Sequence, residues 1–540
     1  MTITSQVLPT VVASSQDRIL HALTPGAKNP LTMLDLSKGR CSDAYTAALA
    51  SALLANSTLT SLNLSDNWIT AVGAASLANA LRVNGTLTSL DLRCNRLTAA
   101  GSASLATALT SNNTLTSLDL SGNRLTDSGA EFLALALSVN STLTSLGLRS
   151  NGITATGAEF LAMMLRVNRT LTSLELDGNC LTANGAAHLA RALIANNTLT
   201  SLDLSINGLT DLGAEFLAET LRTNSALTSL GLRSNKLTAA GAEFLSTALA
   251  ANSTLTSLNL SVNGLTDSGA VFLSAALRVN NTLTALDLGG NCLTGAGADS
   301  LSAALTTNST LTSLDLAGNC LTAAGTEFLS AALTINSTLT SLDLSVNWLA
   351  DEEAASLATA LRANTTLISL VLSGNCLTAA GMVPLAMALT TNNTLRSLDL
   401  SGNRLSDEGT AALAMALRAN SSLAFLDLSD IELTDAGGES LSMMLPANST
   451  LTSLDLSDND ELTEAGLATF ATRLITNTSL TSLGLRNMPE VDASQARDLI
   501  ERNAHNDNEK NELLLRLCLE ALAKIDSGQD ALKRLRTQEQ

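Results

Sequence analysis

Residues 115–125 read Leu-Thr-Ser-Leu-Asp-Leu-Ser-Gly-Asn-Arg-Leu, and close copies of this stretch recur along the chain. Residues 199–209 read Leu-Thr-Ser-Leu-Asp-Leu-Ser-Ile-Asn-Gly-Leu, and residues 311–321 read Leu-Thr-Ser-Leu-Asp-Leu-Ala-Gly-Asn-Cys-Leu. The asparagine, which we call the turn asparagine, recurs at a constant spacing as Asn67, Asn95, Asn123 and so on to Asn403, without an insertion or deletion. A fixed period of this length indicates a solenoid of stacked units rather than several independent domains.

Each unit has two halves with different periodicity. The first half follows the pattern LxxLxLxxNxL, and the second, as in residues 125–137, has apolar residues at helical spacing. We expect Thr126 to cap this helix and Asn140 to form a left-handed turn after it. Each unit is therefore predicted to contain a strand, an asparagine turn, a helix and a second asparagine turn.

Together with the LTxxGAxxLAxAL half, this pattern resembles the ribonuclease-inhibitor-like class of leucine-rich repeats, which also occurs in NOD-like receptors and bacterial effectors. The resemblance implies an α/β solenoid, or horseshoe, of about 17 units of 28 residues spanning residues 29–488. It places a parallel sheet on the concave face and the helices on the convex face. Such solenoids commonly use the concave face for binding.

The composition excludes several classes of protein. With 45% hydrophobic residues the chain is not generally disordered, and with 2% aromatic residues it lacks a stacking platform for single-stranded nucleic acid. A formal charge of −19 has the wrong sign for a phosphate-binding surface. No apolar run approaches the roughly 20 residues of a membrane span. We therefore expect a cytoplasmic, monomeric protein with no nucleic-acid or membrane partner.

Acidic residues recur at the outward position between the last two leucines of the strand pattern. This acidic ladder includes Asp91, Asp119, Glu175, Asp203, Asp287, Asp315 and Asp343. Like charges on neighbouring strands repel one another. Either the aspartate simply came with the repeat and stays solvated, or the ladder forms an acidic groove that attracts a basic partner. Arginines such as Arg149, beside Gly147, are expected to neutralise the ladder locally.

The regular pattern fails most clearly between residues 348 and 455. In this region Trp348 precedes Ala-Asp-Glu-Glu at 350–353, where other units carry Thr-x-x-Gly, and Phe425 replaces a serine. The predicted partner-binding residues are Trp348, Ile368, Val371, Arg396, Asp399, Phe425, Asp427, Ile431 and Asp455. Aromatic, branched and arginine side chains on a polar surface are typical of interface anchors. The alternative is drift in units near the end of the array.

Local signatures of catalysis or metal binding are absent from the sequence. The seven cysteines are never closer than one repeat length, no CxxC or HExxH occurs, and the three histidines form no evident pair. There is no GxxxxGK[ST] or GxSxG sequence. We expect a protein that is not an enzyme and that needs no cofactor or metal.

The two ends differ from the array. Residues 1–28 are rich in Ser and Thr and are predicted to be a leader or cap, with Leu8-Pro9 weakly resembling the start of an F-box. Residues 489–540 contain the apolar stretch 513–519 and are predicted to form a helical C-terminal cap. A partner-binding helix is the alternative for this end.

The sequence thus predicts a protein–protein interaction scaffold that binds a partner protein on the concave face, and the acidic-groove interpretation of the ladder would make that partner basic. It would act as a bacterial effector, delivered into the host cytosol, or as a recognition module similar to those of innate immune receptors. Two alternatives remain. One is a GTPase-activating protein resembling the Ran-specific one, and the other is a ubiquitin-ligase adaptor.

Overall fold

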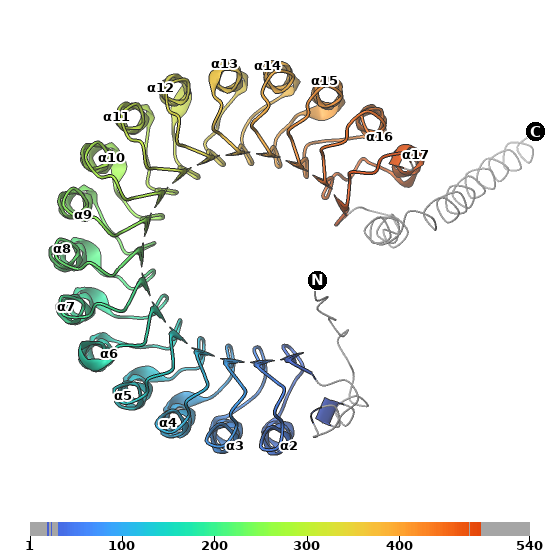
Figure 1. The fold of residues 1–540 in the computed structure, drawn as a ribbon. Coiled ribbons are helices and arrows are strands. Elements are labelled where there is room, and N and C mark those ends of the chain that lie inside the picture. Colours follow the sequence, from blue (N-terminus) through green and yellow to red (C-terminus); the bar gives the residue numbers. More distant parts are fainter. Residues whose placement is uncertain (1–18, 21–22, 24–30, 475, 488–540) are drawn as a thin grey trace, which may run out of the picture. The chain divides into compact units, whose positions relative to one another are not determined.

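The computed structural model describes residues 19–20, 23, 31–474 and 476–487 (Figure 1). The chain forms two compact units, of which unit 1 is Met1–Leu265 with Ala275–Leu283, and unit 2 is Thr266–Ser274 with Thr284–Gln540. Nearly all of the predicted leader at 1–28 and all of the predicted cap at 489–540 lie outside the described residues. Both units alternate short strands with helices at the predicted 28-residue period.

Every described strand has three residues. In unit 1 the strands are β1 (Met33–Asp35), β2 (Ser61–Asn63), β3 (Ser89–Asp91), β4 (Ser117–Asp119), β5 (Ser145–Gly147), β6 (Ser173–Glu175), β7 (Ser201–Asp203), β8 (Ser229–Gly231) and β9 (Ser257–Asn259). In unit 2 they are β10 (Ala285–Asp287), β11 (Ser313–Asp315), β12 (Ser341–Asp343), β13 (Ser369–Val371), β14 (Ser397–Asp399), β15 (Phe425–Asp427), β16 (Ser453–Asp455) and β17 (Ser482–Gly484). Within each unit, successive strands pair in parallel and in the register of the repeat, so that Leu62 lies opposite Leu90.

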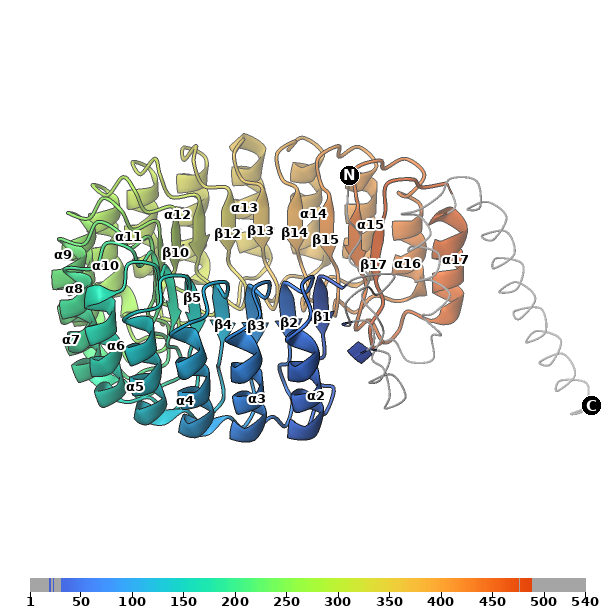
Figure 2. The ribbon, with the colours of Figure 1, turned by 60° about the horizontal axis from the view of Figure 1, so that its bottom comes forward.

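One helix follows each described strand except β17. In unit 1 the helices are α2 (Asp43–Leu53), α3 (Ala71–Leu81), α4 (Thr98–Leu109), α5 (Thr126–Leu137), α6 (Ala155–Val167), α7 (Thr182–Leu193), α8 (Thr210–Leu221) and α9 (Ala239–Leu249). Helix α10 (Thr266–Leu277) has residues in both units. In unit 2 they are α11 (Gly295–Leu305), α12 (Thr322–Leu333), α13 (Asp351–Ala363), α14 (Ala379–Leu389), α15 (Ser406–Leu417), α16 (Asp435–Ser442) and α17 (Glu464–Leu474). In each unit the helices lie outside the strands, which line the inner face (Figures 1 and 2).

The core of each unit is a set of leucine rows between the strands and the helices. In one repeat Leu118 and Leu120 come from the strand region and Leu133 and Leu137 from the helix, and each is at most 1% exposed. A single repeat cannot bury these side chains by itself, so the stacking of repeats supplies the apolar burial that stabilises the array.

The turn asparagines satisfy backbone groups, as predicted. The Nδ2 group of Asn123 donates to the carbonyl oxygens of Leu92, Leu120 and Ser121, and its Oδ1 accepts from the N–H of Leu97. One buried amide therefore ties its own turn to the preceding repeat, which explains why the position tolerates so little change.

The second asparagine row works differently from the prediction. Asn140 donates to the carbonyl oxygens of Leu109 and Asn112 and accepts from two N–H groups that follow it. The expected left-handed conformation is wrong, because the equivalent residues Asn168 and Asn364 have φ of −68° and −74°. The side chain, rather than a left-handed backbone, satisfies the end of the helix.

The predicted cap at Thr126 is also wrong. Thr126 has φ of 59° and no capping hydrogen bond is made at the start of its helix. One repeat later Thr154 is extended, and its side chain accepts from the N–H of Thr156. The carboxylate of Asp127, on the preceding helix, accepts from the N–H and the hydroxyl of Thr154 and from the N–H of Gly157.

This difference follows one rule across the described repeats. An aspartate in the preceding repeat accompanies an extended threonine at Thr70, Thr154, Thr238, Thr294, Thr378 and Thr434. Alanine or glycine at that earlier position accompanies positive φ at Thr98, Thr126, Thr182, Thr210, Thr266, Thr322 and Ser406. Without the carboxylate, the Thr98 N–H donates to the carbonyl of Asn123 instead. An aspartate in one repeat thus sets the backbone of the next.

The irregular segment 350–353 is a local substitute for this cap. Ala350 has no hydroxyl, and the capping position of the preceding repeat is Ala323 instead of aspartate, yet Ala350 is extended with φ of −108°. The Oε2 atom of the buried Glu353, which replaces the usual glycine, accepts from the Ala350 N–H at 2.8 Å. Residues 350–353 therefore have a structural explanation, and the departure from the pattern does not by itself indicate an interface.

Candidate functional site

The aspartates of the acidic ladder end the strands on which they lie. The Oδ1 atom of Asp119 accepts from the N–H of Ser121 at 2.9 Å, which forms a local turn directly after the strand. The same bond, at 2.8–3.0 Å, forms at Asp91, Asp203, Asp287, Asp315, Asp343, Asp399, Asp427 and Asp455. Asn63 and Asn259 make it with an amide oxygen. An amide oxygen makes this bond as well as a carboxylate does, and Gly147, Gly231 and Val371 occupy the same position without either. The position therefore does not depend on a charge, which favours the first of the two interpretations of the ladder.

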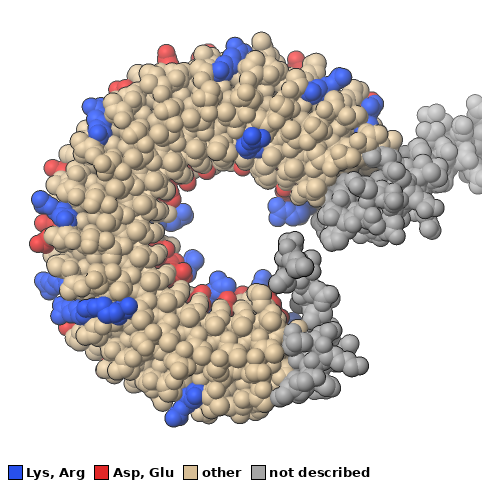
Figure 3. Space-filling view, viewed as in Figure 1, with Lys and Arg blue, Asp and Glu red and all other residues tan. Residues whose placement is uncertain are grey.

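The ladder nevertheless concentrates negative charge on the strand face of each unit (Figure 3). Partial burial raises the pKa of Glu175, and the charges of Asp119, Asp177 and Asp203 raise it further. Burial also raises the pKa of Asp427, with a further contribution from Asp399 and Asp455. Because a raised carboxyl pKa favours the protonated folded state, the stability from these groups is present at low pH and is lost as pH rises through the raised pKa.

Two arginines neutralise acidic side chains of the strand face, and Arg149 reaches an acid of the adjacent repeat, as predicted. Its Nε atom lies 2.9 Å from Oδ2 of Asp177, in the next repeat. Arg93 contacts Asp91 at 2.6 Å and Asp119 at 3.3 Å. These exposed pairs each contribute little to stability, but they divide the acidic surface of unit 1 into shorter stretches.

Three of the predicted partner-binding residues lie at the start of neighbouring strands in unit 2, with Ile368 and Arg396 at equivalent positions and Phe425 one position later, opposite Ser397. Ile368 and Arg396 immediately precede β13 and β14, and Phe425 opens β15. The Arg396 N–H donates to the Ile368 carbonyl, and the Phe425 N–H donates to the Arg396 carbonyl, at 2.8 and 2.9 Å. Ile368 and Phe425 are 46% and 38% exposed, so an apolar surface interrupts the polar face here.

Four further predicted residues form a row at the other end of the same strands. Val371 lies opposite Asp399, Asp399 opposite Asp427, and Asp427 opposite Asp455 in the parallel register. We call Ile368, Val371, Arg396 and Phe425, with the carboxylates of Asp399, Asp427 and Asp455, the strand-face cluster.

The last two predicted residues do not belong to this cluster. Ile431 has no exposed surface, so its assignment as a surface anchor is wrong. It occupies the turn-asparagine position, where an apolar side chain packs into the core while its N–H donates to Oδ1 of Asn459. Trp348 is 75% exposed but lies in the loop between β12 and α13 rather than on a strand.

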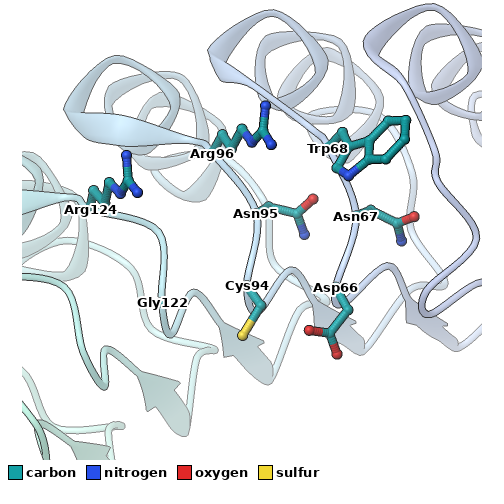
Figure 4. Close-up of a pocket in the computed structure, with 8 residues that line it drawn as sticks. All are labelled: Asp66, Asn67, Trp68, Cys94, Asn95, Arg96, Gly122 and Arg124. Atoms are coloured by element: carbon teal, nitrogen blue, oxygen red, sulfur yellow. The ribbon is translucent and has the colours of Figure 1, made fainter.

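Unit 1 also contains a pocket that was not among the sequence-based predictions. A volume of about 390 Å³ lies over the turns that follow β2, β3 and β4 (Figure 4). It is lined by Asp66, Asn67, Trp68, Cys94, Asn95, Arg96, Gly122 and Arg124. The signal was present, because Trp68, Arg96 and Arg124 occupy the same position, directly after the turn asparagine, in three successive repeats.

Other chemistry is sparse in the part of the chain that the structure describes. No group of three His, Cys, Asp or Glu side chains there could hold a metal ion. Five of the six described cysteines are exposed and all six are free thiols. Within the same residues, every helix is too short or too polar to cross a membrane.

The fold and its strand face define the class of α/β solenoids, in which stacked repeats present one extended binding surface. The family model "Leucine Rich repeat" matches fourteen segments, which together cover more than half of the chain. The matched residues are 55–78, 83–106, 111–134, 139–162, 167–190, 195–218, 223–246, 251–274, 279–302, 307–330, 336–358, 363–386, 391–414 and 447–471. The chain is therefore a leucine-rich-repeat protein, and its assignment to the ribonuclease-inhibitor-like class stays a prediction.

Solved structures with similar folds share little sequence with the chain. The TLR13–ssRNA13 complex is 20% identical, with a TM-score of 0.46 over 80% of this chain and 67% of that chain. The yeast Rad7–Elc1 complex is 18% identical, with a TM-score of 0.41 over 84% and 90%. The internalin inlF of Listeria monocytogenes is 18% identical, with a TM-score of 0.37 over 77% and 94%. No curated protein matches the sequence.

Proposed function

We propose that this leucine-rich-repeat protein is an interaction scaffold that binds a partner protein through the strand-face cluster of unit 2. The observation that carries the proposal is the exposure of Ile368, Arg396 and Phe425 at the starts of three neighbouring strands, where other repeats carry Thr or Ser. Leucine-rich-repeat solenoids use extended faces of this kind for binding.

The strand-face cluster lacks a hydrogen bond that regular repeats make. In a regular repeat the hydroxyl of Thr340 donates to the carbonyl of Thr312, which satisfies both groups at the start of the strand. Ile368 occupies the position of this threonine and has no hydroxyl to donate. Ile368 leaves 46% of its surface exposed in place of this bond, and grouped exposed apolar residues on a polar surface are typical of binding sites.

The carboxylates beside the apolar residues favour a basic partner. Asp399, Asp427 and Asp455 lie on successive strands, about 5 Å apart, and the charges of the two outer groups raise the pKa of Asp427. A lysine or arginine of the partner would relieve this repulsion. We therefore expect the partner to present an apolar side chain flanked by cations.

A matched pair of double variants tests this proposal. Peptides selected from a random library on the full chain are expected to be cationic and apolar, and Phe425→Ala with Val371→Ala is expected to weaken their binding roughly tenfold or more, because it removes apolar contacts and leaves the charge unchanged. Ser257→Ala with Asn259→Ala changes the same two strand positions to alanine in β9, so it should leave affinity unchanged.

The measurement is titration calorimetry of one selected peptide at two salt concentrations. Charge attraction predicts weaker binding at higher salt. Equal affinity for both double variants and the parent protein would contradict the proposal. The roles as a bacterial effector or immune-receptor-like module, the alternatives as a GTPase-activating protein or ubiquitin-ligase adaptor, and the cytoplasmic location stay predictions.

A further inference from the structure

The pocket in unit 1 combines groups that the strand-face cluster lacks. Figure 4 shows Trp68, Arg96 and Arg124 on successive turns along the helix side of the pocket, with Asp66 and Cys94 on the strand side. Trp68 is 51% exposed, so part of its indole ring is open to a ligand. A volume of about 390 Å³ falls within the range of small-molecule sites.

The two arginines of the pocket are unpaired among the described residues. Arg93 and Arg149, on the strand face, each bond a carboxylate at 2.9 Å or less, whereas neither Arg96 nor Arg124 forms an ion pair. The main-chain N–H of Arg96 donates to the Ile69 carbonyl, which fixes the turn and leaves the guanidinium free. Two guanidinium groups without partners form a site for an anion.

The charge of this edge is opposite to that of the chain. Arg40, Trp68, Arg96 and Arg124 occupy equivalent positions in four successive repeats, and all four are exposed. The whole chain carries a formal charge of −19. Because the chain as a whole is negative, it does not attract anions non-specifically. A row of cations at one edge therefore favours an anionic ligand that binds at that place.

The strand side of the pocket offers one acceptor. The pKa of the Cys94 thiol is raised by burial and by the charge of Asp66, so the thiol stays neutral near neutral pH. Asp66 is then the anionic group on this side, and it can accept a hydrogen bond from a ligand hydroxyl or amine. The buried amides of Asn67 and Asn95 are already bonded to the backbone.

We propose that the pocket binds a nucleoside monophosphate, with its base against Trp68, its phosphate between Arg96 and Arg124, and a hydroxyl or amine facing Asp66. This class of ligand carries a planar ring, an anion and a donor in one small molecule, and neighbouring turns hold the complementary groups. The aspartates of the neighbouring strands argue against a longer strand of nucleic acid, because they would repel its backbone.

The two tryptophans of the chain allow a direct test. In a full-length Trp348→Phe protein, Trp68 is the sole indole, and its fluorescence should be quenched saturably by AMP or UMP. Replacement of Arg96 or Arg124 by alanine in this background should weaken binding roughly tenfold each, because each removes a charge-assisted hydrogen bond to phosphate. The matched control is Arg404→Ala, which changes the same repeat position in unit 2 and should have no effect.

Three competitors decide which part of the ligand is bound. Adenosine and inorganic phosphate should each bind much more weakly than AMP, because each lacks either the anion or the ring. A result in which adenosine or phosphate binds as tightly as AMP would overturn the proposal, as would quenching that never saturates. Tighter binding of phosphotyrosine than of either nucleotide would replace the nucleotide with a phosphorylated protein segment and would also overturn it.

Discussion

The two tryptophans of the chain occupy equivalent positions ten repeats apart, and they lie in different surroundings. Both Trp68 and Trp348 directly follow a turn asparagine, and both are exposed, at 51% and 75%. The next two turns carry Arg96 and Arg124 after Trp68, but Cys376 and Arg404 after Trp348. In a repeat protein a residue type at one position therefore does not define a site, because its neighbours one repeat away complete the site.

The turns beneath the two tryptophans also differ in their bonds. Oδ1 of Asn67 accepts from the Cys41 N–H at 2.7 Å, whereas Oδ1 of Asn347 is buried and has no partner among the described residues. Helix α3, which follows Trp68, is capped by the side chain of Thr70. Helix α13, which follows Trp348, is preceded by Ala350, whose N–H donates to the Glu353 carboxylate. The turn at Trp348 is thus the less fully bonded of the two.

Replacement of the turn asparagines is expected to have the largest effect on stability, and the loss should differ between the two turns. Asn67→Ala loses one acceptor bond and donor bonds to the carbonyls of Leu36, Leu64 and Ser65, so it should cost about 3–4 kcal/mol. Asn347→Ala loses donor bonds to Leu316 and Ser345 and no acceptor bond, so it should cost about 2 kcal/mol. Urea unfolding measures both values, and an equal or reversed order would contradict the difference between the turns.

The helix caps should give the next largest effect. Asp43→Ala removes the acceptor for the N–H and hydroxyl of Thr70 and for the N–H of Gly73, and should cost about 1–2 kcal/mol. Thr70 should then adopt the positive φ of Thr98, which a crystal structure of the variant would show. An unchanged extended Thr70 would disprove the rule that links the aspartate to the next repeat.

At the Trp348 turn the same rule can be tested in reverse. Ala323→Asp, Ala350→Thr and Glu353→Gly together restore the aspartate cap that other repeats use. This triple variant should be as stable as the parent or more stable, whereas Glu353→Gly alone should lose about 1 kcal/mol, because the Ala350 N–H loses its acceptor. A triple variant that is less stable than Glu353→Gly alone would contradict this account.

Replacing the threonine at the helix start by glycine should change the stability less, and with opposite sign in two adjacent repeats. Thr98 has φ of 55°, a strained conformation for a β-branched residue, so Thr98→Gly should stabilise the protein by about 0.5–1 kcal/mol. Thr70 is extended and its side chain caps helix α3, so Thr70→Gly should destabilise it by up to about 1 kcal/mol. If both variants changed the Tm of thermal unfolding in the same direction and by the same amount, the two helix starts would be equivalent.

The sequence predicted the fold well because the repeat multiplies each weak local signal. The period, the strand and helix of each repeat and the structural role of the turn asparagines were all predicted correctly, since one pattern specifies all of them. The failures at Thr126 and Asn140 arose because each backbone conformation depends on a partner in a neighbouring repeat. Local propensity at Thr126 favours a cap, but the capping carboxylate would have to come from the preceding repeat, where the chain has Ala99.

The candidate sites were harder to predict for the same reason. Ile431 was mistaken for a surface residue because its departure from the pattern looks like that of Phe425, while burial distinguishes them. The pocket at Trp68 was missed because its residues lie in separate repeats and each is ordinary by itself. Only the alignment of equivalent positions in consecutive repeats brings the tryptophan and the two arginines together.

The smallest expected difference between the Trp68 turn and the Trp348 turn is in the reactivity of the cysteine thiols beside them. Cys41, whose carbonyl accepts from the Trp68 N–H, is 2% exposed, and burial raises its pKa to about 11. At neutral pH roughly one molecule in ten thousand would carry the reactive thiolate. Cys320, in the repeat before Trp348, is exposed.

Iodoacetamide should therefore label Cys320 in the native protein and label Cys41 only after unfolding, as peptide mass mapping would show. Asn67→Ala should expose Cys41 to labelling without unfolding the chain, because it removes the bond that holds the Cys41 backbone. Asn347→Ala should leave the rate at Cys320 unchanged, since no hydrogen bond joins these two described residues. Labelling of Cys41 as fast as that of Cys320 in the parent protein would mean that the Trp68 turn opens readily, and the better-bonded turn would then not be the more rigid one.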